Sequence, residues 1–221
     1  MRMVRSWKTV AVALAMATSA GTVGIGLTAG PASAAPCSDV DIVFARGTGE
    51  SPGLGITGTP FVNSLRQNLG GATVSSYAVT YAASTNQTSA GPGATDMTRH
   101  VVSVAASCPD TTFVLGGYSQ GASVTDISIG IPTVLGSGET IPTALAPRVA
   151  AVVVFGNPLA LSGQHIPTAS PLYGSKAREY CNVGDPVCAN GSNFYAHILY
   201  GFDGSTTDGA AFAAARVRAL G

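Results

Sequence analysis

The sequence predicts a three-layer α/β/α sandwich with a mostly parallel central sheet. Short apolar runs, which are typical of buried strands, alternate with longer segments that are compatible with helices. The strongest strand signal is the apolar run at residues 149–155, which has no polar interruption and so suits a strand covered on both faces. No internal repeat or low-complexity linker interrupts the chain after residue 36. We therefore expect one domain.

The first half of the domain contains a regular alternation of elements. The expected elements are a strand at 40–45, a glycine-rich turn at 47–50, a helix at 60–69, a strand at 74–81, a loop at 84–93 and a helix at 94–107. The first helix has clear end signals, because Thr59 suits the N-cap, Pro60 the first helical position and Gly70 the position after the end.

The second half continues the same pattern. The expected elements are a strand at 111–116, a helix at 120–130, a strand at 149–155, a short strand at 178–181 and a C-terminal helix at 208–220. The strand at 111–116 is a short apolar run of the kind found in buried parallel sheets. In the helix that follows, Ala122, Val124 and Ile127 are available to face the sheet.

The first 34 residues have the three parts of a secretory signal peptide. Basic residues precede an apolar run at 10–17, and a small-residue stretch then ends in Ala32-Ser33-Ala34. Threonine, serine and glycine residues dilute the apolar run well short of the ~20 residues that a membrane anchor needs. We expect cleavage near Ala34, a domain at residues 35–221, and a secreted protein that is free or held at the cell surface.

Low charge limits the range of partners. Charged residues make up 10% of the sequence, against the usual ~25%, and 11 basic residues balance 11 acidic ones. No basic run follows the signal segment, so we expect no nucleic-acid partner. We also expect a monomer with no stable membrane insertion and no cofactor.

All four cysteines follow the predicted cleavage point. An even number in an exported chain favours two disulfides, for which three pairings are formally possible. Cys181 and Cys188 are close enough in sequence to close one short loop with a disulfide. Cys37 and Cys108 would then form a disulfide between distant parts of the chain. No C-x-x-C pair is present, so we expect no metal site.

The stretch GGYSQG at residues 116–121 contains a candidate nucleophile. Ser119 lies between Gly117 and Gly121 in a G-x-S-x-G pattern, whose specific context is a buried strand before it and a helix after it. Both are predicted. The two glycines would let strand and helix approach closely around a strained turn, and the helix N-terminus would place free amide groups beside the serine oxygen. An ordinary glycine-rich turn is the alternative, but it needs none of this context.

A serine hydroxyl needs a base, and the chain has three histidines. In α/β-hydrolases the order along the chain is serine, acid, histidine, which favours His197. His100 precedes the serine and is expected to be an exposed helical residue. His165 lies in a polar loop with no acid near it in sequence.

Two aspartates are candidates for the acid that orients the histidine. Asp126 lies about two turns into the helix after the serine, where it should point away from the catalytic edge of the sheet. Asp185 lies between Cys181 and Cys188, where a disulfide would hold its carboxylate in place. The segment Gly184-Asp185-Pro186 also suits an ordinary turn. We favour Asp185.

The oxyanion that forms during acyl transfer needs two donors. The first is the backbone N–H of Gln120, which follows the nucleophile. The second should come from the turn after the first strand, where Thr48 can offer both its N–H and its hydroxyl.

Taken together, these segments resemble the cutinase family of secreted serine esterases. The matching segments are FARGTGE, CPDTTFVLGGYSQGAS, FGNP, CNVGDPVC and AHILYG, in the family's order and spacing. The resemblance implies a compact α/β-hydrolase domain without a large lid, with Ser119 as nucleophile, His197 as base and Asp185 as orienting acid. It also implies Thr48 and Gln120 as the oxyanion hole, and disulfides Cys37–Cys108 and Cys181–Cys188.

The sequence departs from the family pattern in two places, and the first bears on the substrate. Fungal cutinases that act on plant polyester carry aliphatic residues on the loops beside the serine, whereas residues 88–93 and 191–195 are smaller and more polar apart from Phe194 and Tyr195. We therefore expect short- to medium-chain fatty acyl esters. Acetylxylan esterase, phospholipase or thioesterase activity, or a non-catalytic secreted binding protein, are the alternatives.

The second departure concerns the group that braces the oxyanion hydroxyl, which is an asparagine in the family. Asn86 and Thr88 lie near that position. Neither is assigned as the brace.

Overall fold

The structure is a computed structural model that describes residues 37–221, so the predicted signal peptide lies outside the described residues. The strands of this part are β1 (Val40–Ala45), β2 (Val74–Ala78), β3 (Thr112–Tyr118), β4 (Val149–Phe155) and β5 (Ala177–Tyr180). Its helices are α1 (Gly55–Asn68), α2 (Ala90–Ser107), α3 (Gln120–Ser128), α4 (Ile166–Ala169), α5 (Phe194–Ile198) and α6 (Ser205–Arg218). Short 3₁₀ turns lie at Thr143–Arg148, Pro158–Ser162 and Gly174–Lys176.

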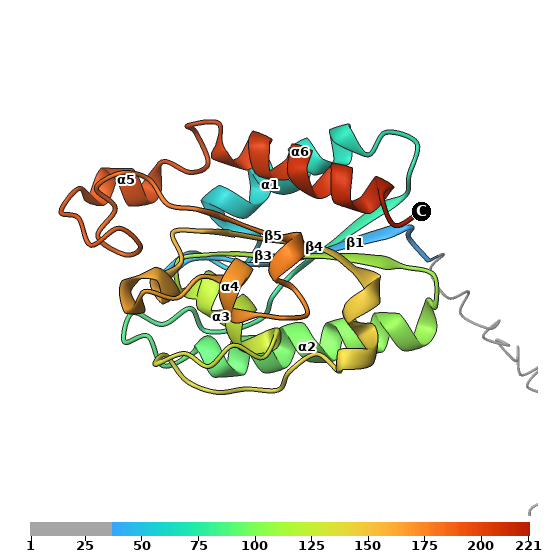
Figure 1. Ribbon diagram of the computed structural model, residues 1–221, viewed down its shortest axis with the longest axis horizontal. Coiled ribbons are helices and arrows are strands. Elements are labelled where there is room, and N and C mark those ends of the chain that lie inside the picture. Colours follow the sequence, from blue (N-terminus) through green and yellow to red (C-terminus); the bar gives the residue numbers. More distant parts are fainter. Residues whose placement is uncertain (1–36) are drawn as a thin grey trace, which may run out of the picture. The chain divides into compact units, whose positions relative to one another are not determined.

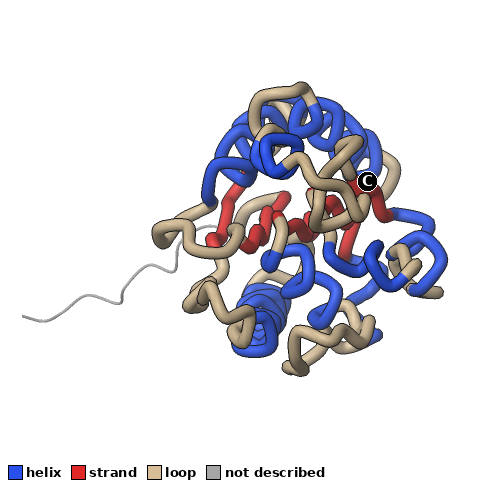
Figure 2. The backbone as a smooth tube through the Cα atoms, turned by 90° about the vertical axis from the view of Figure 1, so that its left-hand side faces the viewer, coloured by secondary structure: helices blue, strands red, loops and turns tan. Residues whose placement is uncertain are grey.

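The strands form one sheet in the order β2-β1-β3-β4-β5, and every neighbouring pair is parallel. Helices α1 and α6 cover one face, and α2 and α3 cover the other (Figure 1). Seen from the side on which α5 lies, the sheet is a band between two helical layers (Figure 2). The predicted three-layer sandwich with a parallel sheet is confirmed.

The two faces of the sheet bury separate apolar clusters. Between the sheet and α1 and α6, the rings of Phe44, Phe61 and Phe155 pack with centroids 5.8 to 6.4 Å apart. On the other face, Leu115 and Met97 belong to a cluster that includes residues of α2 and α3. Strand β4 is buried along its whole length, as expected for an apolar run that faces both layers.

The topology creates a ligand site at one point of the sheet. Strands β2 and β3 lie on opposite sides of β1, so the crossover from β1 to β2 and the crossover from β2 to β3 run in opposite directions across the sheet. Ligands of such sheets bind at this switch point, outside the carboxyl ends of the strands. Ala45 pairs with Gly117 near the ends of β1 and β3, so the turns that follow them open at the same place.

Helix α1 starts five residues earlier than predicted, at Gly55, and the assignment of Thr59 as its N-cap is wrong. The first turn is held by Glu50, whose Oε1 accepts a hydrogen bond of 2.7 Å from the amide of Ile56. The hydroxyl of Thr59 instead bonds back to the carbonyl of Gly55 at 2.8 Å, and Pro60 lies inside the helix.

Other helix boundaries also differ from the predicted ones. Helix α2 starts at Ala90, inside the stretch expected to be a loop, and α6 starts at Ser205, whose amide is capped by Asp203 at 2.9 Å. The short helices α4 and α5 were not predicted. Within residues 37–221, none of the helices combines the length and apolarity needed to cross a membrane.

Candidate active site

Ser119 occupies a strained turn between β3 and α3. Its φ of 56° and ψ of −121° lie in a region that non-glycine residues rarely adopt, at a cost of ~1–3 kcal/mol. A Cβ atom at Gly117 would lie 2.0 Å from the carbonyl oxygen of Gly121, and one at Gly121 would lie 2.0 Å from that of Ala45. Both glycines are therefore required by the close approach of strand and helix, as predicted.

A continuous hydrogen-bond chain joins Ser119, His197 and Asp185. Ser119 Oγ lies 2.9 Å from His197 Nε2, and His197 Nδ1 lies 2.8 Å from Asp185 Oδ2. A carboxylate can only accept, so Nδ1 carries the proton and Nε2 is free to accept one from the serine hydroxyl. His197 and Asp185 are buried, whereas Ser119 is partly exposed. The fold thus brings the three predicted residues together from the end of β3, the loop after β5 and helix α5.

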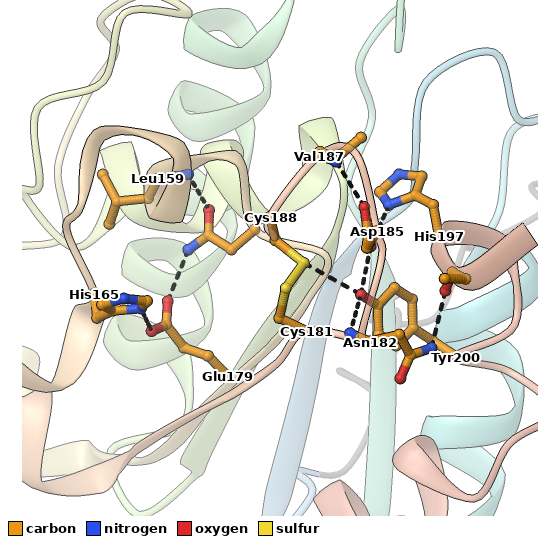
Figure 3. The surroundings of a disulfide bond; sticks show 12 residues. Leu159, His165, Glu179, Cys181, Asn182, Asp185, Val187, Cys188, His197 and Tyr200 are labelled. Atoms are coloured by element: carbon orange, nitrogen blue, oxygen red, sulfur yellow. Dashed lines mark hydrogen bonds and ion pairs between the residues drawn. A yellow bond between two sulfur atoms is a disulfide. The ribbon is translucent and has the colours of Figure 1, made fainter. Parts of the chain in front are cut away.

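The carboxylate of Asp185 accepts hydrogen bonds on both oxygens (Figure 3). Oδ1 accepts from the amide of Val187 at 2.7 Å, and Oδ2 accepts from the hydroxyl of Tyr200 at 2.5 Å as well as from His197. Burial and the bond to Asp185 raise the pKa of Tyr200, which keeps this hydroxyl protonated as a donor. Sequence reasoning missed Tyr200, although it follows His197 by three residues, one helical turn away.

The loop that carries Asp185 is closed by a disulfide between Cys181 and Cys188, and a second disulfide joins Cys37 to Cys108. This is the pairing that the sequence favoured. The hydroxyl of Tyr200 accepts from the amide of Asn182 at 3.0 Å and lies 3.4 Å from Cys188 Sγ (Figure 3). The Tyr200 side chain thereby connects the disulfide loop and the carboxylate to the segment that follows α5.

Thr48 and Gln120, the predicted oxyanion donors, are linked through Gln87. Gln87 Nε2 donates to Thr48 Oγ1 at 2.9 Å, and Gln87 Oε1 accepts from Gln120 Nε2 at 2.9 Å. Because Thr48 Oγ1 accepts this bond, its own hydrogen is free to point at a ligand oxygen. The Gln120 amide lies in the first turn of α3, where amides have no partner within the helix.

Gln87 therefore stands where sequence reasoning had considered Asn86 and Thr88. Asn86 Oδ1 is occupied within its own loop, by the hydroxyls of Ser84 and Thr88 at 2.7 and 2.8 Å. The composition of this loop offered no signal that would select the glutamine.

Two further residues restrain His197. The hydroxyl of Tyr118 donates to the carbonyl of His197 at 2.9 Å, and the two rings lie 5.0 Å apart. Gly156, in the FGNP segment, has a φ of 57°, and a Cβ atom there would lie 2.7 Å from Cε1 of the imidazole. A side chain at residue 156 would push the ring out of place.

The expectation that His100 is an exposed helical residue is wrong. Helix α2 packs it against the sheet, where Nε2 lies 2.7 Å from Oδ2 of buried Asp41 and the ring stacks on Tyr77 at a centroid distance of 3.7 Å. The carboxylate partner belongs to β1, far from residue 100 in sequence. These contacts give His100 a place in the packing of α2.

The other rejected candidates form a separate network. Asp126 makes no hydrogen bond to Ser119 or His197 and is fully buried, with Oδ1 accepting from Asn157 Nδ2 at 3.2 Å. Burial raises its pKa well above the usual value. His165 finds an acid that is distant in sequence, since its Nδ1 lies 3.0 Å from Glu179 Oε2. Within residues 37–221 no cluster of His, Cys, Asp or Glu side chains is arranged to hold a metal ion.

Comparison with known families agrees with this geometry. A family model described as Cutinase matches residues 36–217. The chain belongs to the cutinase family. Cutinases are carboxylic ester hydrolases, and the family match covers all of the hydrogen-bonded groups described above.

Individual relatives of this cutinase-family chain extend the comparison. A cutinase from Kineococcus radiotolerans is 62% identical over 190 residues, which cover 85% of this chain and 65% of the relative's length. A solved structure of Trichoderma reesei cutinase in complex with a C11Y4 phosphonate inhibitor is 30% identical, with a TM-score of 0.66 over 82% of this chain and 78% of that one. A solved acetyl xylan esterase is 25% identical, with a TM-score of 0.72 over 82% of this chain and all of that one.

Proposed function

We propose that the protein hydrolyses carboxylic esters through an acyl intermediate on Ser119, with His197 as general base and Asp185 as the acid that orients it. The observation that carries the proposal is the hydrogen-bond chain from Ser119 Oγ through His197 to Asp185, with links of 2.9 and 2.8 Å. This arrangement matches the roles of a serine triad.

In the proposed reaction, Ser119 Oγ attacks the ester carbonyl carbon while His197 Nε2 takes the hydroxyl proton. The carbonyl oxygen becomes an oxyanion, which the Thr48 hydroxyl and the Gln120 amide stabilise. His197 then gives the proton to the departing alcohol, and the carbon–oxygen bond breaks to leave acyl-Ser119. Water, activated in the same way, releases the acid. Asp185 stabilises the imidazolium that forms in each step.

We propose short- to medium-chain fatty acyl esters as the substrates. Support comes from the loop residues at 88–93 and 191–195, which are small or polar apart from Phe194 and Tyr195 and so offer few aliphatic contacts for a long acyl chain beside the serine. The partly exposed Ser119 also suits substrates that approach from solution or from a surface.

Replacement of Ser119 by alanine tests the proposal. The S119A variant should lose hydrolysis of p-nitrophenyl butyrate while its circular dichroism and thermal midpoint remain those of the wild type. A fluorophosphonate probe should label the wild type and not the variant. Turnover retained by S119A, or a wild type that the probe does not label, would rule out Ser119 as the nucleophile.

Deacetylation of xylan is a second candidate, because the fold aligns with an acetyl xylan esterase over that protein's whole length. The substrates of the two candidates differ in both parts of the ester, since acetylated xylan carries an acetyl group on a sugar hydroxyl. Rates on acetylated xylan and on a C4 to C8 acyl ester series, measured with the same preparation, separate them. A rate on acetylated xylan above that on every acyl ester would favour the second.

We further propose that residues 1–34 direct export and that the mature protein, residues 35–221, acts as a secreted monomer. The signal-like sequence and the two disulfides support this proposal, since disulfides persist in oxidising compartments. Sequencing the N-terminus of the protein recovered from culture medium, together with light scattering, tests both parts.

A further inference from the structure

An open groove of about 840 Å³ lies between the start of α1 and the segment that follows α5. One wall is formed by Gly201 and Phe202, and the other consists of residues 49–56 with Thr59, Pro60 and Asn63. The walls meet where Gly201 passes the carbonyl oxygen of Ile56, since a Cβ atom at Gly201 would lie 2.5 Å from it. The groove has no role in the triad described above.

Both walls of the groove are continuous with the active site. Gly49 directly follows Thr48, and Gly201 and Phe202 directly follow Tyr200. Tyr118 contacts both the turn before Gly49 and the helix before Gly201. Its ring lies 2.6 Å from where a Cβ atom of Gly47 would stand, and its hydroxyl donates to the carbonyl of His197. The groove therefore lies beside the active site, between the segment that continues from the oxyanion turn and the segment that continues from the histidine.

The lining of the groove suits an uncharged, apolar ligand. Phe202 and Ile56, two large apolar residues that line it, are 75% and 45% exposed. Glu50 is the one charged residue among those that line it, and its carboxylate is engaged by the protein. Oε2 accepts from the amide of Gly47 at 2.5 Å and Oε1 from that of Ile56 at 2.7 Å.

We propose that this groove binds the apolar alcohol portion of an ester substrate. The leaving oxygen must receive its proton from His197 Nε2, so the alcohol departs on the histidine side of the serine. Phe202 belongs to the segment that continues from His197, and an alkyl chain directed along this segment reaches the groove. The inference rests on the proposed esterase function and adds a subsite for the leaving group.

Two series of soluble esters test this assignment. One keeps the butyryl group and lengthens the alcohol from ethyl to octyl, and the other keeps the p-nitrophenol leaving group and lengthens the acyl chain. The value of kcat/KM is measured below the solubility limit of each ester. In the wild type it should rise roughly 2-fold per methylene of the alcohol, about half the effect of full burial, because the groove is open on one side.

The variants Phe202→Ser and Ile56→Ser should lower the octyl-to-ethyl ratio of kcat/KM, by roughly 5-fold for Phe202→Ser, as apolar contact area is lost. Leu161→Ser is the matched control, since Leu161 is 51% exposed outside the groove. The octyl-to-ethyl ratio of kcat/KM for Leu161→Ser should equal that of the wild type. Thermal midpoints show that each variant is folded.

The other outcomes are equally informative. An unchanged octyl-to-ethyl ratio in both variants overturns the proposal, and so does a loss confined to the acyl series or equal in the two series. A loss of similar size in Leu161→Ser also overturns it. If the wild type cleaves no ester in either series, the proposed function itself fails, which separates that failure from a failure of the groove.

Discussion

Tyr200 donates a hydrogen bond of 2.5 Å to Oδ2 of Asp185, the same carboxylate oxygen that lies 2.8 Å from Nδ1 of His197. Two donors thus share one oxygen of a fully buried carboxylate. The tyrosine hydroxyl draws negative charge away from the bond to His197, so it sets both the position of Asp185 and the strength with which Asp185 favours the imidazolium.

Removing this hydroxyl in Tyr200→Phe should change the pH dependence of catalysis. The carboxylate then concentrates its charge on His197, which stabilises the imidazolium, so the acid limb of the kcat/KM profile should move to higher pH. The free energy of unfolding should fall by about 1.5–3 kcal/mol, as for a hydrogen bond to a charged group. The profile on p-nitrophenyl butyrate and denaturant unfolding measure the two effects.

Tyr173→Phe is the matched control, because the Tyr173 hydroxyl is also buried but has no hydrogen-bond partner within residues 37–221. Its pH profile should match that of the wild type. A lower stability of Tyr200→Phe with an unmoved acid limb would mean that Tyr200 supports the loop but does not tune the base.

Gln87→Ala should lower kcat by roughly 10-fold, a smaller effect than loss of an oxyanion donor itself, which typically costs ~10²–10³-fold. The reason is that Gln87 acts through Thr48, whose hydroxyl would lose its 2.9 Å restraint and rotate freely. Thr88→Ala is the control, since the Thr88 side chain bonds to Asn86 in the same loop at 2.8 Å. Steady-state kinetics on p-nitrophenyl butyrate measure both.

The pathway through Thr48 has its own test in a double-mutant cycle. Thr48→Val removes the hydroxyl, so adding Gln87→Ala in that background should cost little more. An equal, additive loss in the two backgrounds would show that Gln87 supports the site by another route.

The sheet and its helices were predictable because a strand that is buried on both faces requires a run of apolar residues, which is visible in the sequence. The run at β4 is apolar throughout and those at β1 and β3 are mostly apolar. The G-x-S-x-G segment joins a strand to a helix with glycines that sterics demand. The order of Ser119, Asp185 and His197 along the chain also selected residues that the fold brings within hydrogen-bond distance.

The misses share a different cause, because they depend on contacts between residues that are far apart in sequence. His100 of helix α2 is placed by Asp41 of strand β1, 59 positions away in sequence. Gln87 reaches Thr48 across 39 positions, and no local pattern distinguishes it from its polar neighbours in the loop. The residues that a loop side chain contacts depend on how the whole chain packs.

The two disulfides should separate stability from activity. Their sequence separations are 71 residues for Cys37–Cys108 and 7 for Cys181–Cys188, so chain-entropy arguments give losses of about 4 and about 2 kcal/mol on replacement by serine pairs. The loss of activity should follow the opposite order, with the larger loss on replacement of Cys181 and Cys188. Cys37 and Cys108 lie before β1 and β3, at the amino ends of the strands, whereas the short loop carries Asp185. Denaturant unfolding and kcat, measured on both double variants, test the crossed ranking. A short-loop variant with wild-type kcat would contradict it.

Stability should fall with rising pH because of Asp126. Burial raises the pKa of this carboxyl well above its usual value, and the charge of Glu179 raises it further. The folded chain therefore keeps a proton that the unfolded chain has released, so it binds more protons, and the free energy of unfolding declines as pH rises from the unfolded pKa towards the folded one. Asp126→Asn has no such proton.

The difference in thermal midpoint between Asp126→Asn and the wild type should therefore grow in favour of the variant from about pH 5 to about pH 9. The groups that face Asp126 are the Asn157 amide and, beyond it, Glu179 with His165, and all three are present in both proteins. Any change in their ionisation is thus largely common to the pair. A constant difference for Asp126→Asn across the range would mean that Asp126 is ionised in the folded chain, with its charge compensated through Asn157.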